Sequence, residues 1–353
     1  MHIRSVGRAL PPHRYSQAEL TAAFRRHLCG DEPQIGKRLE AFHRSAAVEW
    51  RHLALPIEAY PGLRDFGRKN DAFIEVGLAL AEAAIRDGLA RAGLEPRDVD
   101  ALYVVSVTGV AVPTLDARLV DRLGLRHDVK RNPLFGLGCV AGAAGIARLH
   151  DYLLAWPKQV AILVSVELCS LTLQHDDLSI PNLIGSGLFG DGAAAVVGVG
   201  DAHPAAGPGA PRVVATRSRL YPDSEDAMGW QVSGTGFRLL LSPKVPALVR
   251  DHLRADVDGF LADQGLSRSD IAAWLLHSGG PRVLLEAQQA LELKEDALEA
   301  SWRSLRQIGN LSSASVLFVL GEALDERRIA PGSDVMMLAM GPGFCAELVR
   351  IRW

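Results

Sequence analysis

The chain has 353 residues, of which 48% are hydrophobic, with 38 Lys and Arg against 41 Asp and Glu. This length allows about two or three domains, or one large unit with a substantial core. The near-neutral charge lacks the basic excess that nucleic-acid binding requires, so we expect no nucleic-acid partner. The four cysteines are scattered and form no CxxC pair, which indicates neither a metal (zinc) site nor a disulfide scaffold.

Signals for secretion or membrane insertion are absent from the sequence. The opening residues 1–8 carry charges, and no apolar core follows them, unlike a signal peptide. The longest uncharged stretch, residues 101–115, contains Gly109 and Pro113 and falls short of the roughly 20 apolar residues of a spanning helix. We therefore expect a cytoplasmic protein with no membrane span.

Short apolar runs alternate with helical patterns along the chain, which predicts an α/β fold. Ser16–Glu19 forms a capping box, and we expect a helix from there through Arg26. Residues 71–92 have helical periodicity that ends near Gly93. Residues 101–107 and 160–166 are continuous apolar runs, as expected of strands buried on both faces.

An Ala/Gly/Pro-rich stretch, residues 201–211, follows the apolar run 193–199 and predicts a boundary between two halves. We assign residues 1–210 to an N-terminal half and residues 211–353 to a C-terminal half.

The two halves resemble each other. Residues 97–109 and 269–280 each show a capped turn that feeds a buried strand. Residues 138–153 and 309–324 each show a glycine followed by a helix of small residues. The spacing is too long for a solenoid repeat and suggests duplication of an α/β unit.

Cys139 stands in a glycine-rich segment, FGLGCVAGAAG, at residues 135–145. The glycines permit a tight strand-to-helix turn, and a helix N-terminus stabilises a thiolate. This context favours a nucleophile, although most buried cysteines are simply small core residues.

Two further candidates come from the C-terminal half. His277 closes the apolar run 271–276 and precedes a glycine turn, where it is either part of a site or a structural histidine. Asn310 opens the second small-residue helix, where a lone Asn is by default an ordinary N-cap. If the duplication is real, Cys139 and Asn310 occupy matching helix starts and share one site.

These segments resemble the type III polyketide synthases, the chalcone synthase superfamily within the thiolase fold. The resemblance rests on five motifs that stand in the family's order, namely FGLGCVAGAAG (135–145), LFGDGAAA (188–195), HSGGP (277–281), GNLSSA (309–314) and GPGF (341–344). It implies a thiolase-like α/β fold in which two duplicated αβαβα halves pack in layers. One departure is Ser278, where family members usually have Pro.

The resemblance implies that Cys139, His277 and Asn310 form a catalytic triad. A Cys139 thiolate, paired with His277, would take an acyl group from coenzyme A. Malonyl-CoA would then lose CO2, and His277 and Asn310 would donate to the enolate oxygen. Acyl-CoA and malonyl-CoA would be substrates, and no cofactor or metal is implied.

The resemblance also implies residues around the cavity. Phe189 matches the family's gatekeeper phenylalanine, and Phe237 matches a second gate. Val112 matches a position that crosses the interface of a homodimer into the partner's cavity. Further matches to lining positions are Thr108, Cys169, Thr172, Ser312 and Pro342. A basic tunnel mouth for the coenzyme A phosphates would use Arg44, with Arg51 and Arg282 beside it.

Residues 166–187 look most like the bacterial members that make alkylresorcinols or alkylpyrones from long fatty acyl starters. The modest side chains at the lining positions leave room for an alkyl chain; these are Val112, Cys169, Thr172 and Ser312. The alternatives are a short, aromatic or malonyl starter, or a single condensation like that of the initiating β-ketoacyl-ACP synthases. A cysteine protease and a non-catalytic relative are the more distant alternatives.

Overall fold

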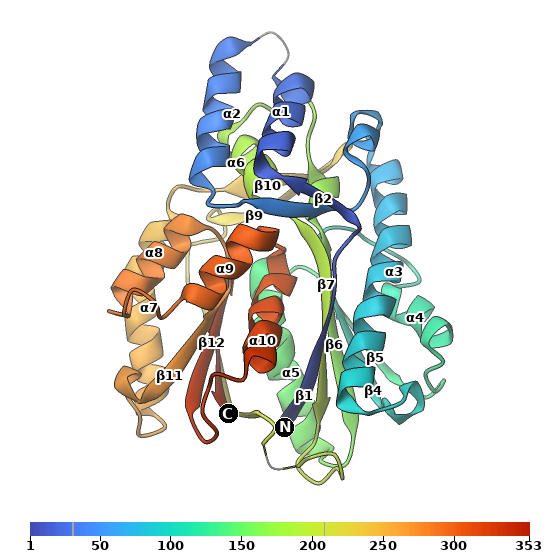
Figure 1. Cartoon of the computed structure of the whole chain (residues 1–353), viewed down its shortest axis with the longest axis vertical. Coiled ribbons are helices and arrows are strands. Elements are labelled where there is room, and N and C mark those ends of the chain that lie inside the picture. Colours follow the sequence, from blue (N-terminus) through green and yellow to red (C-terminus); the bar gives the residue numbers. More distant parts are fainter. Residues whose placement is uncertain (30–31, 208) are drawn as a thin grey trace.

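The computed structural model describes residues 1–29, 32–207 and 209–353 (Figure 1). A nine-stranded sheet runs through the molecule in the order β11-β12-β13-β8-β1-β7-β6-β4-β5. The strands of its first half are β1 (His2–Ala9), β4 (Ala101–Val105), β5 (Lys130–Leu134), β6 (Val160–Leu168) and β7 (Asp191–Val199). Those of its second half are β8 (Arg212–Leu220), β11 (Ile271–Leu276), β12 (Asp334–Gly341) and β13 (Cys345–Arg352).

Four strands of each half of the sheet share one topology, and β5 is an additional edge strand of the first half. In the first half β4 is parallel to β6, which is antiparallel to β7, which is antiparallel to β1. In the second half β11, β12, β13 and β8 repeat this sequence of parallel and antiparallel pairs. The halves join where β1 meets β8, at His2 and Arg212. This repetition agrees with the predicted duplication of an α/β unit.

Helices cover both outer faces and fill the space between the halves. The major helices are α3 (Phe66–Ala92), α4 (Leu115–Leu123), α5 (Ala141–Ala155), α7 (Val245–Ala262), α8 (Pro281–Ala290), α9 (Glu299–Ile308) and α10 (Ser315–Glu326). In Figure 1, α3 and α4 lie on the right, α7 and α8 on the left, and α5 and α10 between them. Three separate apolar cores correspond to the three helical layers. The architecture is the predicted layered, thiolase-like α/β fold.

A smaller upper region stands at one end of the layers in Figure 1. It contains α1 (Gln17–Leu28), α2 (Pro33–Ser45), α6 (Ile180–Leu188), β2 (His13–Ser16), β3 (Trp50–Leu53), β9 (Met228–Ser233) and β10 (Gly236–Leu241). Strands β9 and β10 form a two-stranded sheet of their own, as do β2 and β3.

The local predictions agree with these elements to within a few residues. Ser16 caps α1 with both bonds of the capping box, and the helix runs two residues beyond the predicted end. Helix α3 ends as predicted at Gly93, which adopts the left-handed conformation at φ +67°. It begins five residues before residue 71, because Asp65 caps it by accepting from the Arg68 N–H.

The capped turns that suggested the duplication are present in both halves. Glu95 and Asp98 form a capping box just before β4, and Ser267 and Asp270 form one just before β11. The proposed boundary at residues 201–211 lies between β7 and β8, and residue 208 within it lies outside the described residues.

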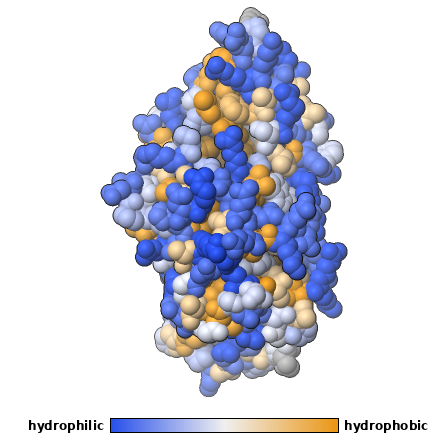
Figure 2. Space-filling view, turned by 90° about the vertical axis from the view of Figure 1, so that its left-hand side faces the viewer, coloured by the Kyte–Doolittle hydropathy of each residue, from blue (hydrophilic) through white to orange (hydrophobic). Residues whose placement is uncertain are grey.

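The face seen in Figure 2 is mostly hydrophilic, with apolar residues exposed in separate groups. No helix in the described ranges is long and apolar enough to cross a membrane.

Candidate active site

Cys139 lies in a single 3-10 turn, Gly138–Val140, which leads directly into α5. Gly138 has φ +60°, and a Cβ there would lie 2.5 Å from Cδ of Pro342. Only glycine therefore fits between the nucleophile turn and the Gly341–Gly343 loop. This close approach places Pro342, a predicted lining residue, beside the Cys139 turn.

The matching turn of the second half, Ser312–Ala314, leads into α10 and lies against the first. The Cys139 thiol lies 3.6 Å from Oγ of Ser312. Asn310 Oδ1 accepts the Ser312 N–H at 2.8 Å, which fixes the Asn310 side chain at the start of the turn. A Cβ at Gly142 of α5 would lie 2.2 Å from the Ser313 carbonyl oxygen, so the two helix starts are in backbone contact. The predicted meeting of Cys139 and Asn310 is therefore what the structure shows.

His277 follows β11 and joins the same group through the glycine turn. Asn310 Nδ2 donates to the Gly279 carbonyl at 3.1 Å, and a Cβ at Gly279 would lie 3.1 Å from Cδ2 of His277. The turn thus folds back over the imidazole and brings it toward Asn310. Neither ring nitrogen of His277 has a hydrogen-bond partner within the described ranges.

Burial dominates the proton equilibria of Cys139 and His277. It raises the pKa of the Cys139 thiol to about 12, although hydrogen bonds from Ser312 and Asn310 act in the other direction. Burial also lowers the pKa of His277 to about 4. Each group alone would be neutral at pH 7. The expected thiolate–imidazolium pair would therefore require the charge of each group to offset the burial cost of the other.

Glu167 is a functional candidate that the sequence analysis missed. It is fully buried in β6, where it accepts hydrogen bonds from Thr108 Oγ1 at 2.9 Å and from the Val107 N–H at 3.1 Å. Ser313, next to Ser312, also donates to it. Burial raises the pKa of Glu167 to about 7, and its charge raises the pKa of Cys139. The sequence signal for this candidate was a single acidic residue, Glu167, in an otherwise apolar run.

Phe189 ends α6 and is tied to the site by its neighbours in the chain. Asn310 donates its N–H to Leu188 O at 2.9 Å, and Gly190 donates to Asn310 O at 3.0 Å. The predicted gate and Asn310 are thus held on adjacent extended segments.

The structure corrects the expectation for Arg51. Its side chain is 1% exposed and donates from Nη1 to the Phe189 carbonyl at 2.8 Å. Arg51 is therefore not part of a solvent-facing basic mouth, and it fixes the backbone of the predicted gate. Burial lowers the pKa of Arg51 to about 10, and the carboxylate of Asp191 acts in the opposite direction.

Cys169, Thr172 and Phe237, three of the other predicted lining residues, are buried, whereas Val112 is not. Cys169 and Phe189 border a cavity of about 30 Å³. Thr172 donates to the Cys169 carbonyl at 2.8 Å. Phe237 in β10 is 4% exposed, and its ring centroid lies 5.2 Å from that of Phe66. Val112 is 94% exposed in the single chain, so it contributes nothing to this chain's own cavity.

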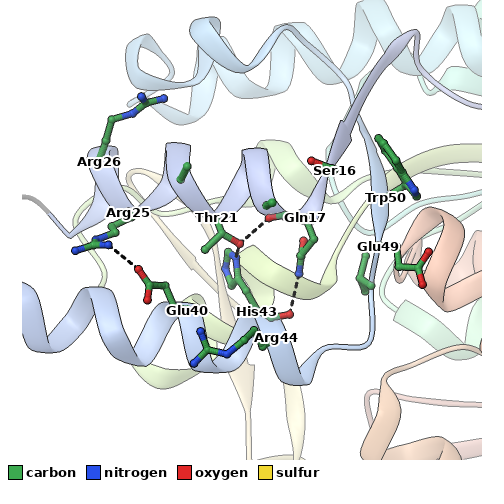
Figure 3. Close-up of a pocket in the computed structure, with 13 residues that line it drawn as sticks. Ser16, Gln17, Thr21, Arg25, Arg26, Glu40, His43, Arg44, Glu49 and Trp50 are labelled. Atoms are coloured by element: carbon green, nitrogen blue, oxygen red, sulfur yellow. Dashed lines mark hydrogen bonds and ion pairs between the residues drawn. The ribbon is translucent and has the colours of Figure 1, made fainter.

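Arg44 and Arg282 are exposed, as a basic mouth would require. Arg282 is the second residue of α8, close behind the His277 turn. Arg44 lies on α2 at a groove of about 980 Å³ between α1 and α2, shown in Figure 3. Arg25 and Glu40 pair across this groove, and His43 contacts Thr21 at its floor. No group of three or more metal-binding side chains is found in the ranges that the structure describes.

The layered fold and the buried Cys, His and Asn side chains define a thiolase-like enzyme class. The family model for chalcone and stilbene synthases matches the chain over residues 1–203 with its N-terminal domain and over residues 212–353 with its C-terminal domain. The chain belongs to this family of type III polyketide synthases, which are acyltransferases. The more distant alternative of a cysteine protease is therefore wrong.

Individual relatives agree with the family match. The chain is 54% identical over 351 residues to 1,3,6,8-tetrahydroxynaphthalene synthase of Streptomyces peucetius subsp. caesius, covering 99% of this chain and 93% of that one. It is 34% identical to a putative chalcone synthase of Bacillus subtilis, covering 99% and 98% of the two chains. The crystal structure of 1,3,6,8-tetrahydroxynaphthalene synthase from Streptomyces coelicolor A3(2) superposes with a TM-score of 0.94 at 31% identity, covering 100% and 99%.

Proposed function

We propose that this synthase uses malonyl-CoA as both starter and extender, with Cys139, His277 and Asn310 as its reacting residues, and closes the chain to a hydroxylated aromatic product. The proposal of a malonyl-CoA starter is supported by the 54% identity, over nearly the whole chain, to a tetrahydroxynaphthalene synthase. A tetrahydroxynaphthalene carries hydroxyls and no alkyl substituent, so none of its carbon comes from a long fatty acyl starter. Two-carbon units from malonyl-CoA account for such a skeleton.

The site geometry supports a loading step at Cys139. The thiolate attacks the thioester carbonyl, the bond to the coenzyme A sulfur breaks, and the His277 imidazolium gives its proton to the departing thiolate. The start of α5 and the bonds from Ser312 and Asn310 stabilise the Cys139 sulfur before attack. The acyl group is then held on Cys139.

In the extension step, His277 and Asn310 stabilise the negative charge of an enolate. When malonyl-CoA loses CO2, the electrons of the breaking C–C bond form an enolate with negative charge on the thioester oxygen. The His277 N–H and the second N–H of the Asn310 amide would donate to that oxygen, since the first N–H is bonded to Gly279. The enolate carbon attacks the acyl group on Cys139, the C–S bond breaks, and the Cys139 thiolate is regenerated for the next cycle.

A long-chain fatty acyl starter is the second candidate. It rests on the resemblance of residues 166–187 to the alkylresorcinol and alkylpyrone synthases and on the modest side chains of Val112, Cys169, Thr172 and Ser312, which leave room for an alkyl chain.

Product analysis by mass spectrometry separates the two starters. The purified chain is incubated with malonyl-CoA alone, and in parallel with malonyl-CoA plus an equimolar long-chain fatty acyl-CoA. We expect hydroxylated aromatic products from malonyl-CoA alone, with little alkylated product when the fatty acyl-CoA is added. Turnover only in the presence of the fatty acyl-CoA would overturn the malonyl starter and support the alkyl product.

A further inference from the structure

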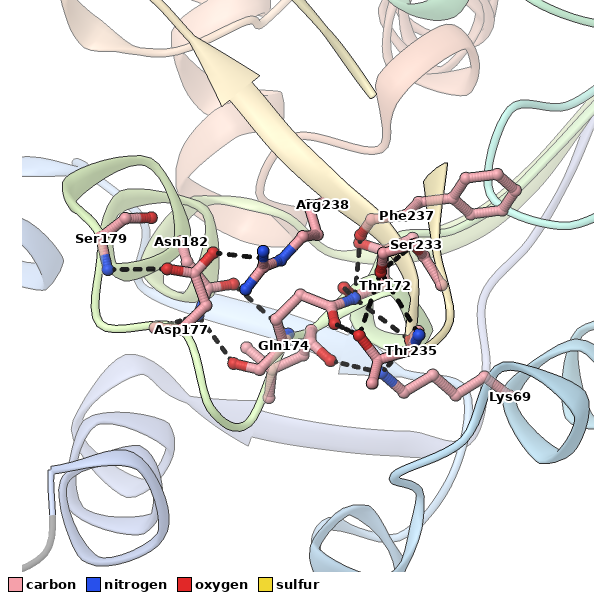
Figure 4. Close-up of polar contacts among 12 residues, drawn as sticks. Lys69, Thr172, Gln174, Asp177, Ser179, Asn182, Ser233, Thr235, Phe237 and Arg238 are labelled. Carbon is pink, nitrogen blue, oxygen red and sulfur yellow. Dashed lines mark hydrogen bonds and ion pairs between the residues drawn. The ribbon is translucent and has the colours of Figure 1, made fainter. Parts of the chain in front are cut away.

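The hairpin that carries Phe237 is not held by the main sheet. Strands β9 and β10 pair only with each other among the described strands. An isolated two-stranded hairpin is marginally stable in water, so side-chain contacts must fix its position. Figure 4 shows these contacts, which come from α3, the segment around residue 174 and α6.

Lys69 of α3 is one attachment point. Its side chain is almost fully buried, and Nζ donates to the Leu173 carbonyl at 2.8 Å and to the Thr235 carbonyl at 3.0 Å. Thr235 lies in the turn between β9 and β10, so one ammonium group joins three separate segments. Burial lowers the pKa of Lys69 to about 8, which is the cost of placing a charge here without a bonded carboxylate. A Met of similar length would fill the same space without donating.

Gln174 is the second attachment point and reaches Phe237 directly. Its Nε2 donates to the Phe237 carbonyl at 3.0 Å and to the Thr172 carbonyl at 2.9 Å. Its Oε1 accepts from Thr235 Oγ1 at 2.7 Å. Asn182 of α6 in turn holds the backbone of Gln174 by donating to its carbonyl at 2.8 Å. Gln174 therefore sets the spacing between the backbones of Thr172 and Phe237.

By the family resemblance, Thr172 lines the cavity and Phe237 forms its second gate. We propose that Lys69 and Gln174 are positioning residues that fix Thr172 and Phe237 relative to the cavity and thereby set how far the polyketide grows before release. This inference rests on the proposed cavity roles of Thr172 and Phe237, and on the family's reaction; it does not depend on which starter is used. Neither Lys69 nor Gln174 needs to touch the substrate for this role.

The test uses Lys69→Met and Gln174→Glu. The second substitution keeps the acceptor for Thr235 and removes the donor to Phe237. Arg68→Met is the matched control, because Arg68 is the neighbouring residue on α3, its side chain is 73% exposed, and its recorded ion pair is with Asp65 alone. Products are quantified as the ratio of short, early-released pyrones to the full-length product, using whichever starter the wild-type chain turns over.

We expect both variants to raise this ratio by about threefold or more, the change that one lost hydrogen bond of ordinary strength produces, while Arg68→Met leaves it unchanged. The rate of Cys139 alkylation should stay at the wild-type value, and Lys69→Arg should restore part of the wild-type ratio. A general loss of activity at an unchanged ratio would overturn the proposal and leave a structural role only. If Lys69→Met fails to fold, Gln174→Glu decides alone by the same ratio. A wrong starter would show in the wild-type products and would leave this comparison intact.

Discussion

At the scale of single residues, the thiolate depends on a second charge. Burial disfavours ionised Cys139 and protonated His277 alike, as the directions of both pKa shifts show. Ser312 and the helix start supply only partial compensation, because the thiol is a weak hydrogen-bonding group. We therefore predict that the imidazolium of His277 is the group that makes the thiolate accessible near neutral pH.

The first prediction removes that partner. In His277→Ala, alkylation of Cys139 by iodoacetamide at pH 7 should fall by at least about tenfold, equivalent to about 1.4 kcal/mol of lost charge pairing. Peptide mapping reports each cysteine separately, and Cys345, the least buried of the four, serves as the internal control. An unchanged Cys139 rate would mean that His277 does not stabilise the thiolate.

The second prediction concerns Glu167, whose removal should change the rate of Cys139 alkylation in the opposite direction. Its negative charge raises the pKa of Cys139, so Glu167→Gln should lower that pKa and speed alkylation of Cys139 at pH 7. The pH profile of alkylation should shift to lower pH relative to the wild type. A shift to higher pH would show that the carboxylate acts on the thiol by some route other than its charge.

Sequence reasoning predicted that the turns carrying Cys139 and Asn310 meet, as they do, but misplaced Arg51. A glycine-rich turn before a small-residue helix is a local pattern, and its duplication indicates which two turns meet. Burial of an arginine is a tertiary property that no local pattern encodes, so Arg51 read as an ordinary surface charge. Lys69 was not predicted as a functional residue for the same reason, because its acceptors are backbone carbonyls distant in sequence.

At the scale of elements, the site is built where the starts of α5 and α10 press together. Gly142 allows this approach, since a Cβ there would lie 2.2 Å from the Ser313 carbonyl oxygen. Backbone cannot move aside as a flexible side chain can. The contact therefore fixes the distance between the turns that carry Cys139 and Asn310.

The next prediction tests that contact. Gly142→Ala should lower the free energy of unfolding by about 2 kcal/mol or more through overpacking, and should reduce condensation activity by displacing Asn310. The control is Gly62→Ala, because a Cβ at Gly62 would meet no atom within 4 Å. Denaturant titration and turnover of malonyl-CoA measure the two effects. Wild-type stability and activity in Gly142→Ala would show that the helix starts are free to separate.

The whole molecule contains two copies of one α/β unit. The duplication of an α/β unit was predicted from the sequence because capped turns and glycine-led helices recur in both halves. The joining of both half-sheets through β1 and β8 was not predicted, since this short junction, one paired position at His2 and Arg212 with two flanking backbone hydrogen bonds, leaves no pattern in the chain. The upper region likewise depends on side-chain bonds between segments far apart in sequence.

The exposed apolar residues Val112 and Phe135 bear on how whole chains associate. Val112 is 94% exposed and Phe135 58% exposed in the single chain, and Val112 matches a position that crosses the dimer interface in the family. We predict that the chain forms a homodimer that covers Val112, and that Val112→Asp weakens it by placing a charge in the interface. Sedimentation velocity of both proteins at equal concentration measures this. A monomeric wild type would contradict the prediction.

The most direct test of the central claim is to locate the acyl group on the enzyme. The purified chain is mixed with malonyl-CoA, quenched in acid within one turnover, digested and mapped by mass spectrometry. The account predicts an acyl mass on the peptide containing Cys139, none on the peptide containing Cys169, and no acylation in Cys139→Ala. An acyl group found on another residue, or its persistence in Cys139→Ala, would contradict the assignment of Cys139 as the loading nucleophile.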